Sequence, residues 1–153
     1  MSTISIRQAT LADLDAVVPL FDAYRQFYGR ASDVAAARTF LQARFQHGES
    51  IVLLARDGDA AVGFTQLYPS FSSVSLARIF VLNDLFIHPP ARKRGVATGL
   101  LAAAAEYARS QGAIRLTLST ATTNVTAQAV YEAAGWQRDA EFYVYHFTVK
   151  SSL

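Results

Sequence analysis

The 153-residue sequence contains no cysteine, one methionine and one tryptophan. Without cysteine the chain cannot form disulfides, thiolate metal sites or a covalent intermediate on a cysteine nucleophile. A cysteine-free protein is expected in the reducing cytoplasm. The three histidines, His47, His88 and His146, form no pair at helical or hairpin spacing, so we expect no metal site.

Long apolar runs are also absent, because charged residues, glycine or asparagine interrupt them well short of the roughly 20 residues that a spanning helix needs. The first 20 residues lack a basic start and include Asp13 and Asp15, so we predict neither a signal peptide nor a membrane association. Net charge is +2 and the isoelectric point about 9.1. This basic bias is compatible with a small polyanionic ligand and is too weak to indicate nucleic-acid binding.

The remaining composition is that of a folded domain, with 52% hydrophobic and 17% charged residues. A chain of this length fits one hydrophobic core, so we predict a single domain over residues 1–153. At its start, Ile4 and Ile6 alternate with polar residues as in a strand, and Thr10 with Asp13 forms a capping-box pattern that opens a helix. A second helix is predicted from Ser32 to just before Gly48.

The middle of the chain predicts an antiparallel meander. Residues 50–56 contain a continuous apolar run, and Asp57-Gly58-Asp59 supplies a hairpin turn into a strand over residues 61–68. A turn is predicted over residues 69–73, followed by a long strand over residues 74–87. Pro89 and Pro90 end that strand, because proline donates no backbone hydrogen bond.

The last third predicts a strand-helix-strand crossover and two further elements. Residues 96–109 are alanine-rich and helical, and a short strand is predicted over residues 114–118. Residues 126–134 are predicted as the last helix. The alternating aromatic and aliphatic residues over 142–149 predict a last strand.

The segment between the long strand and the alanine-rich helix has the character of an anion site. Unpaired N–H groups at a helix N-terminus attract phosphate, and Gly95 and Ala97 let it approach the backbone closely. Arg92, Lys93 and Arg94 add positive charge. The alternative is a solvated loop that caps an ordinary helix.

The run Arg92-Lys93-Arg94-Gly95-Val96-Ala97 resembles the signature (Q/R)-x-x-G-x-(G/A) of the GNAT (GCN5-related N-acetyltransferase) superfamily. About thirty residues later, the run from Asn124 through Ala127 and Tyr131 to Trp136 resembles the second motif, N-x-x-A-x-x-x-Y-x-x-x-G-(F/W). The order of elements over nearly the whole chain is also similar to this family. The resemblance implies an α/β (α+β) fold: a mixed, mostly antiparallel sheet of six to seven strands, about four flanking helices and a central βαβ acetyl-CoA unit.

The resemblance further implies acetyl-CoA as co-substrate, with no metal. Successive backbone amides of the Gly95 loop would hold the pyrophosphate, and the end of the long strand would pair with the pantetheine arm. The residues implied in cofactor binding are Leu85, Phe86, Ile87, Arg92, Lys93, Arg94, Gly95, Val96, Ala97, Thr98, Asn124, Ala127 and Tyr131. Asn124 is also a natural helix cap.

Three residues are candidates for catalysis. Through the resemblance, Tyr131 is implied as the general acid that protonates the leaving thiolate; the alternative is a core aromatic. Asp84, a carboxylate in an apolar strand, could act as base, directly or through water, or hold the substrate ammonium, and the alternative is a structural ion pair with Arg78. Asn83 should point to the opposite face of a regular strand, so only one of the two should face the amine.

The implied reaction is direct transfer of an acetyl group to a primary amine of a small molecule in a ternary complex. Within the superfamily the pattern is nearest to bacterial and fungal amine and diamine or polyamine acetyltransferases, although Asn83 stands where the polyamine enzymes carry a glutamate. The alternatives are a protein amine as acceptor, a non-catalytic acyl-CoA sensor and a nucleic-acid-binding domain that uses the three bases at 92–94. The aromatic last strand predicts a homodimer.

Overall fold

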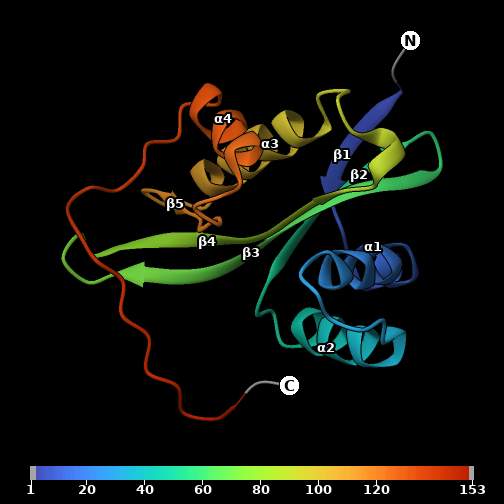
Figure 1. Cartoon of the computed structure of the whole chain (residues 1–153), viewed down its shortest axis with the longest axis horizontal. Helices are drawn as coiled ribbons and strands as arrows, with labels where there is room; N and C mark the ends of the chain where they lie inside the picture. The colour runs from blue at the N-terminus through green and yellow to red at the C-terminus, as the bar shows by residue number, and fades with distance from the viewer. Residues whose placement is uncertain (1–2, 152–153) are drawn as a thin grey trace.

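The computed structural model describes residues 3–151 as a central sheet between two helical layers (Figure 1). The sheet has five strands in the order β1-β2-β3-β4-β5, all antiparallel neighbours except the parallel pair β4 and β5. The strands are β1 (Ile4–Gln8), β2 (Ile51–Asp57), β3 (Ala60–Ser72), β4 (Ala77–Ile87) and β5 (Leu116–Thr117). The mixed α/β architecture is as predicted, but the described chain has fewer strands than the expected six to seven.

Two helices cover each face of the sheet. The α1–α2 pair lies on one face, and α3 with α4 lies on the other (Figure 1). The bounds are α1 (Leu14–Phe27), α2 (Val34–Gln46), α3 (Val96–Ser110) and α4 (Val125–Ala133), with 3-10 turns η1 (Leu11–Asp13) and η2 (Pro89–Ala91). The predicted capping box is confirmed, because the Thr10 N–H donates to Asp13 Oδ2 at 2.8 Å at the start of η1. Within residues 3–151, none of the helices combines the length and the apolar character needed to span a membrane.

The predicted turn over residues 69–73 is wrong, since β3 continues to Ser72 and pairs there with Ala77 at the start of β4. Pro69 is tolerated inside β3 because β2 pairs with β3 only as far as Leu67. Beyond that point one side of β3 is open, and the missing proline N–H costs no bond to β2. The turn therefore lies after Ser72, and β4 is shorter than the predicted strand over residues 74–87.

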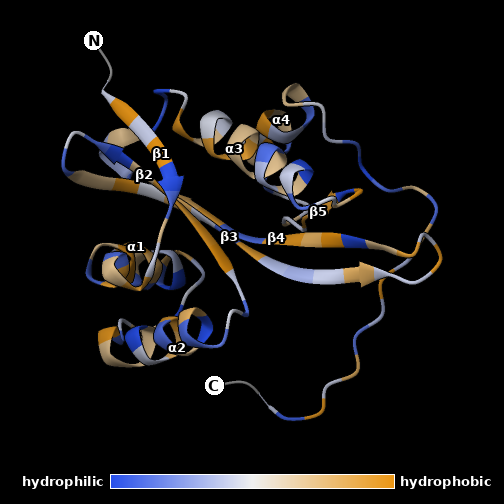
Figure 2. Ribbon diagram, turned by 180° about the vertical axis from the view of Figure 1, so that it is seen from behind, coloured by the Kyte–Doolittle hydropathy of each residue, from blue (hydrophilic) through white to orange (hydrophobic). Residues whose placement is uncertain are grey.

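The predicted last strand over residues 142–149 is also wrong. The segment has no strand partner among the described residues, and it runs away from the body of the molecule after α4 (Figures 1 and 2). Hydrophobic and hydrophilic positions alternate along it as in a strand (Figure 2). A strand needs a neighbour to satisfy its backbone, and the adjacent predicted strand over 114–118 is reduced to the two residues of β5.

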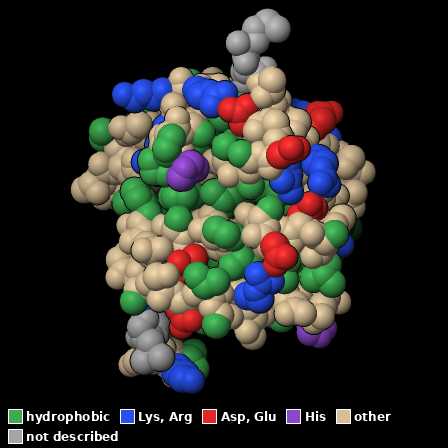
Figure 3. All heavy atoms as spheres, turned by 90° about the vertical axis from the view of Figure 1, so that its right-hand side faces the viewer, with side chains coloured by type: hydrophobic (Ala, Val, Ile, Leu, Met, Phe, Trp, Pro, Cys, Tyr) green, Lys and Arg blue, Asp and Glu red, His purple; other side chains and the backbone are tan. Residues whose placement is uncertain are grey.

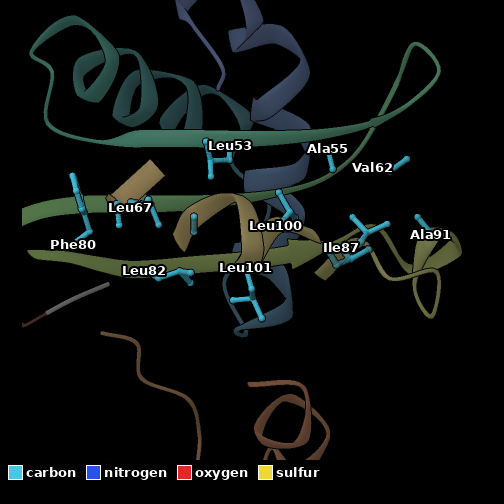
Figure 4. Close-up of a cluster of buried hydrophobic side chains, with 13 residues drawn as sticks. Leu53, Ala55, Val62, Leu67, Phe80, Leu82, Ile87, Ala91, Leu100 and Leu101 are labelled. Carbon is cyan, nitrogen blue, oxygen red and sulfur yellow. The ribbon is translucent and has the colours of Figure 1, made fainter. Parts of the chain in front are cut away.

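Apolar side chains fill both spaces between the sheet and the helices. On the α3 face, Leu100 and Leu101 point toward Leu53, Leu82 and the neighbouring side chains of the sheet (Figure 4). On the other face, α1 and α2 bury a second cluster that includes Val17, Leu41 and Phe64.

Gly99 lets α3 lie close to the sheet, because a Cβ at this position would come within 2.9 Å of Ile6 Cδ1. This close contact holds the first turn of α3 in place at one end of the sheet.

Candidate functional site

The loop before α3 has the backbone geometry of an anion site. Gly95 is the N-cap of α3 with φ +78°, a left-handed conformation that favours glycine, and Lys93 is also left-handed with φ +64°. The first helical hydrogen bond runs from the Gly99 N–H to the Gly95 carbonyl at 3.0 Å. The N–H groups of the preceding residues in this turn therefore have no acceptor within the helix and can bind a ligand.

The three bases of the loop have different surroundings. Arg92 donates from Nε to the Ile87 carbonyl at 3.0 Å, and Arg94 forms an ion pair with Asp57 at 2.9 Å. Lys93 forms no hydrogen bond or ion pair with any residue between 3 and 151. On the face seen in Figure 3, basic side chains alternate with acidic ones and form no continuous basic area. Arg92 and Arg94 are thus held in contacts within the protein, whereas the Lys93 ammonium is available to a ligand.

The C-terminal half of β4 has an open edge next to this loop. β5 pairs only with Phe80 and Val81, so among residues 3–151 no strand lies beside the remainder of β4. The His88 N–H donates to the Val62 carbonyl in β3, and backbone groups alternate in direction along a strand. Leu85 and Ile87 consequently direct their backbone groups toward the open edge. The Ile87 carbonyl accepts the hydrogen bond from Arg92, so the other groups of these two residues are the ones that an extended ligand can pair with.

A β-bulge in β4 places Asn83 and Asp84 in the same cavity. Gln66 of β3 is opposite Asp84 and Leu67 is opposite Leu82, so Asn83 is the extra residue. Both side chains line a cavity of about 500 Å³ between β4 and the α1–α2 pair. The expected placement of the two side chains on opposite faces of a regular strand is therefore wrong, because strict alternation fails at a bulge. That only one of them faces the amine stays a prediction.

Asp84 is buried, with 3% exposure, and two side-chain amides donate hydrogen bonds to it. Gln66 Nε2 donates to Oδ2 at 2.6 Å, and Asn83 Nδ2 donates to Oδ1 at 2.9 Å. The alternative of an ion pair with Arg78 is wrong, since the Arg78 guanidinium lies over the Phe71 ring at 4.7 Å. No cationic side chain among residues 3–151 pairs with Asp84, so this carboxylate can bind a cationic ligand.

The charge of Asp84 acts on two tyrosines in the wall of the cavity. Burial first, and then the Asp84 carboxylate, raise the pKa of Tyr68 to about 12 and raise that of Tyr24 further. The Tyr24 hydroxyl donates to the Asn83 carbonyl at 3.3 Å, so α1 is tied to the bulge itself. Both phenols stay protonated at neutral pH and can donate hydrogen bonds to a bound molecule.

Tyr131 lies on α4, where it is half-buried against the core cluster under α3. Burial, and to a smaller extent the neighbouring Tyr28, raise its pKa, so it is protonated at neutral pH. Its hydroxyl has no hydrogen-bond partner in the described chain. Tyr28, which contributes to this shift, also lines the Asp84 cavity.

The start of α4 is capped by Asn124, and a second cavity separates α4 from α3. Asn124 is the N-cap of α4 and accepts a hydrogen bond from the Ala127 N–H at 3.1 Å, which confirms its predicted capping role. A second cavity of about 290 Å³ lies between the two helices, lined by Thr98, Ala129, Val130, Ala133 and Ala134. In residues 3–151 no group of three or more histidine or acidic side chains is placed to hold a metal ion.

Several residues around the Asp84 cavity were not among the predicted site residues. They come from three other elements, and they include Tyr24, Arg25 and Tyr28 of the α1 region, Phe40 of α2 and Tyr68 of β3. Helical spacing placed Phe21 and Tyr24 on one face of the first helix. Spacing of this kind predicts burial and does not distinguish a core from the wall of a cavity.

Comparisons with known proteins agree with this architecture. Residues 17–136 match the Acetyltransferase (GNAT) family. The uncharacterised N-acetyltransferase YhfO of Bacillus subtilis is 47% identical over 146 residues, which cover 95% of this chain and 98% of the relative. A crystal structure of a probable acetyltransferase superposes with a TM-score of 0.92 at 43% identity, covering 97% of this chain and 99% of the other.

A more distant structure, an aminoglycoside N-acetyltransferase in complex with coenzyme A, shares the fold with a TM-score of 0.80 at 21% identity. It covers 96% of each chain. The family match spans most of the chain, and the Bacillus relative is similar over nearly its whole length. The chain therefore belongs to the GNAT family of acetyltransferases and is an N-acetyltransferase.

Proposed function

We propose that this protein transfers the acetyl group of acetyl-CoA to the primary amine of a small molecule, by direct attack within a ternary complex. The supporting observation is the two-sided arrangement around β4. The buried carboxylate of Asp84 faces a cavity on one side, and the open strand edge and the Gly95 loop lie on the other. A cysteine-free composition supports the cytoplasm as the location.

The residues on the open side fit coenzyme A. The free N–H groups at the start of α3 suit its pyrophosphate, and the left-handed backbone of the loop exposes them. The backbone groups of Leu85 and Ile87 suit an amide-containing arm such as pantetheine. Lys93 supplies a free cation, and Asn124 and Ala127 lie at the start of the neighbouring helix α4. The distant aminoglycoside acetyltransferase that was crystallised with coenzyme A has the same fold.

In this proposal acetyl-CoA supplies a thioester, and the protein positions the amine and moves two protons. Asp84, directly or through a water molecule, accepts the proton that the amine loses as its nitrogen bonds to the acyl carbon. Asn83 orients the Asp84 carboxylate by its hydrogen bond, and the backbone N–H of Ile87, which faces the open edge, polarises the acyl oxygen. Tyr131, kept protonated by its raised pKa, donates a proton to the sulfur as the carbon–sulfur bond breaks.

The test is release of coenzyme A thiol from acetyl-CoA across a panel of small amines, with the product identified by mass. Amino acids, diamines, polyamines and aminoglycosides belong in the panel, together with peptides that carry a free N-terminus or a lysine. We expect amine-dependent thiol release with at least one small molecule. Release with peptides alone would redirect the proposal to a protein acceptor. Binding of acetyl-CoA without any release would leave a non-catalytic sensor.

We also propose that the protein is a homodimer in which residues 142–149 bind a second copy. Six large apolar or aromatic side chains of this segment are exposed, from 75% for Phe142 to 91% for Phe147 and Val149. Exposed strand-forming sequence of this kind is a site of association, and β5 presents the outer edge of the described sheet. Pairing with another copy would bury these side chains and satisfy the backbone of the segment.

Light scattering of the full chain and of a chain truncated after residue 140 tests this proposal. We expect a dimer mass for the full chain and a monomer mass for the truncated chain. Circular dichroism of the truncated chain checks that its helices are retained. A monomeric full chain at micromolar concentration, or a dimeric truncated chain, would contradict the proposal.

A further inference from the structure

The Asp84 cavity has the size and walls of a small-molecule site. Its volume of about 500 Å³ lies within the range of roughly 300–1,000 Å³ that is usual for ligand pockets. Five aromatic rings surround it, from Phe21, Tyr24, Tyr28, Phe40 and Tyr68. The rings of Tyr24 and Tyr28 meet edge to face with centroids 5.1 Å apart, and Phe21 and Phe40 stack at 5.8 Å. These contacts hold the walls in fixed positions around an apolar middle.

The charged groups around the cavity are unequal in number. Asp84 is the single acidic residue of the lining, whereas two arginines, Arg25 and Arg30, belong to it. Arg25 is half-buried on the last turn of α1 and forms no ion pair with another described residue. A half-buried cation that forms no ion pair is positioned to bind an anionic group of a ligand.

The acidic residue closest to Arg25 along the chain is already used elsewhere. Asp22 accepts hydrogen bonds from Ser32 Oγ at 2.7 Å, from the Asp33 N–H at 2.8 Å and from Gln26 Nε2 at 3.1 Å. These bonds fix the connection between α1 and α2, which carries Arg30. The Asp22 carboxylate is thus hydrogen-bonded to the loop. Arg25 has a smaller electrostatic effect on Asp22 but forms no ion pair with it, so the Arg25 guanidinium can bind a ligand in the cavity.

From this distribution we infer that the acceptor amine carries an anionic group, a carboxylate or a phosphate, as well as its reacting nitrogen. The inference rests on the proposed acetyl transfer and narrows its substrate. Asp84 binds the ammonium end, the aromatic walls contact an apolar middle, and Arg25 binds the anionic end. A polycation such as a polyamine or an aminoglycoside would place further positive charges beside the two arginines, which opposes binding.

The experiment measures kcat/KM for thiol release with pairs of amines that differ only at the second group. Phenylalanine is compared with phenylalaninamide, 5-aminopentanoate with 1,5-diaminopentane, and an aminoalkyl phosphate with the matching amino alcohol. We expect the anionic member of a pair to be preferred by roughly 10- to 100-fold, the range for one charge-assisted contact. The phosphate and carboxylate pairs together identify which anion Arg25 prefers.

The variant Arg25→Gln should reduce the ratio of the two kcat/KM values in each pair toward one, and Arg25→Lys should restore part of the preference. The control is Arg38→Gln, because Arg38 of α2 is paired with Asp15 at 2.7 Å and does not line the cavity. A preference for the polycationic member, or an Arg25→Gln variant with the parental ratio, would overturn the inference while the acetyltransferase proposal stands. If no amine promotes thiol release, the proposed function itself fails and the inference fails with it.

Discussion

The two sides of β4 are built in different ways. On the side of the Gly95 loop, the groups available to a ligand are mainly backbone N–H and C=O groups, at the start of α3 and along the open edge of β4. On the opposite side, the Asp84 cavity is made of side chains from α1, α2, β3 and β4. Backbone groups are the same for every sequence, so the first side suits a shared co-substrate. Side chains vary freely, so the second side can select its own acceptor.

The largest expected effect is at Tyr131, which the proposal places where the two sides meet. Tyr131→Phe removes the hydroxyl and keeps the ring that packs near Trp136. We expect kcat to fall by about 10²–10⁴-fold, the usual cost of losing a general acid, with a smaller change in KM. Steady-state kinetics with the best amine measures this, and equilibrium binding of acetyl-CoA serves as the control that should stay unchanged.

The raised pKa of Tyr131 adds a pH criterion. A general acid must be protonated, and its pKa lies above the ordinary value of 10.0, so Tyr131 should cause no loss of kcat below about pH 10. A Phe variant that keeps the parental kcat would show that another group or water protonates the thiolate.

The next largest effect should appear only in the binding of acetyl-CoA at the Gly95 loop. Gly95→Val forces a β-branched residue into the left-handed region at φ +78°, which costs at least about 1–2 kcal/mol if the loop keeps its shape. For the parent, acetyl-CoA at 100 times its Kd should stabilise the fold by about 2.7 kcal/mol, and the variant should lose this thermal shift. Differential scanning fluorimetry with and without acetyl-CoA measures both.

Gly112→Val is the matched control, because Gly112 follows the other end of α3 with φ +71° and, like Gly95, has open space where a Cβ would lie. We expect this variant to be destabilised by a similar backbone strain and still to gain stability from acetyl-CoA. Equal thermal shifts in the two glycine variants would place the co-substrate away from the Gly95 loop.

The smallest effect on the kinetics should be confined to the Asp84 cavity, where the acceptor amine is proposed to bind. Asp22→Asn weakens the charge-assisted bonds that fix the α1–α2 connection, so we expect a loss of roughly 1–3 kcal/mol of unfolding free energy at pH 7. The KM of the acceptor should rise while the Kd of acetyl-CoA stays the same. Urea unfolding and separate titrations of the two substrates measure these changes, and Asp15→Asn, at an exposed carboxylate, is the control.

The hydrogen bonds from Ser32 and from the Asp33 N–H lower the pKa of Asp22 below its ordinary 3.8, against the opposing effect of burial. A lowered folded-state pKa means that the stabilisation is present above about pH 3.8 and is lost as pH falls through the folded-state value. The difference in stability between parent and Asn variant should therefore shrink in acid. A difference that is the same at pH 7 and pH 3 would show that the Asp22 charge is not its source.

Local sequence signals predicted the elements whose cause is local. The capping box at Thr10, the Asn124 cap and the left-handed Gly95 at the start of α3 were all visible in short runs of residues. The misplaced turn at residues 69–73 has a different origin. Whether Pro69 interrupts β3 depends on where β2 ends beside it, which is a property of strand pairing.

Sequence spacing did not predict the bulge at Asn83, and this bulge changes where the site residues lie more than any other unpredicted feature does. Period-two alternation placed Asn83 and Asp84 on opposite faces, yet one extra residue against β3 brings both into one cavity. Residues 142–149 have a clear strand pattern, but no described strand pairs with them. A pattern of alternating residues predicts the capacity to form a strand, whereas pairing requires a neighbour.

The sequence by itself determined the family, the order of the main helices and strands, and the position of the loop proposed to bind the co-substrate. These depend on local propensity and on short motifs whose glycine and capping residues have a local physical role. Only the tertiary structure decided that Asp84 pairs with Gln66 and Asn83 and that Arg25 shares its cavity, and only it showed that β4 has an open edge. Contacts between residues far apart in the chain arise from packing and strand register, and no local run of residues specifies them.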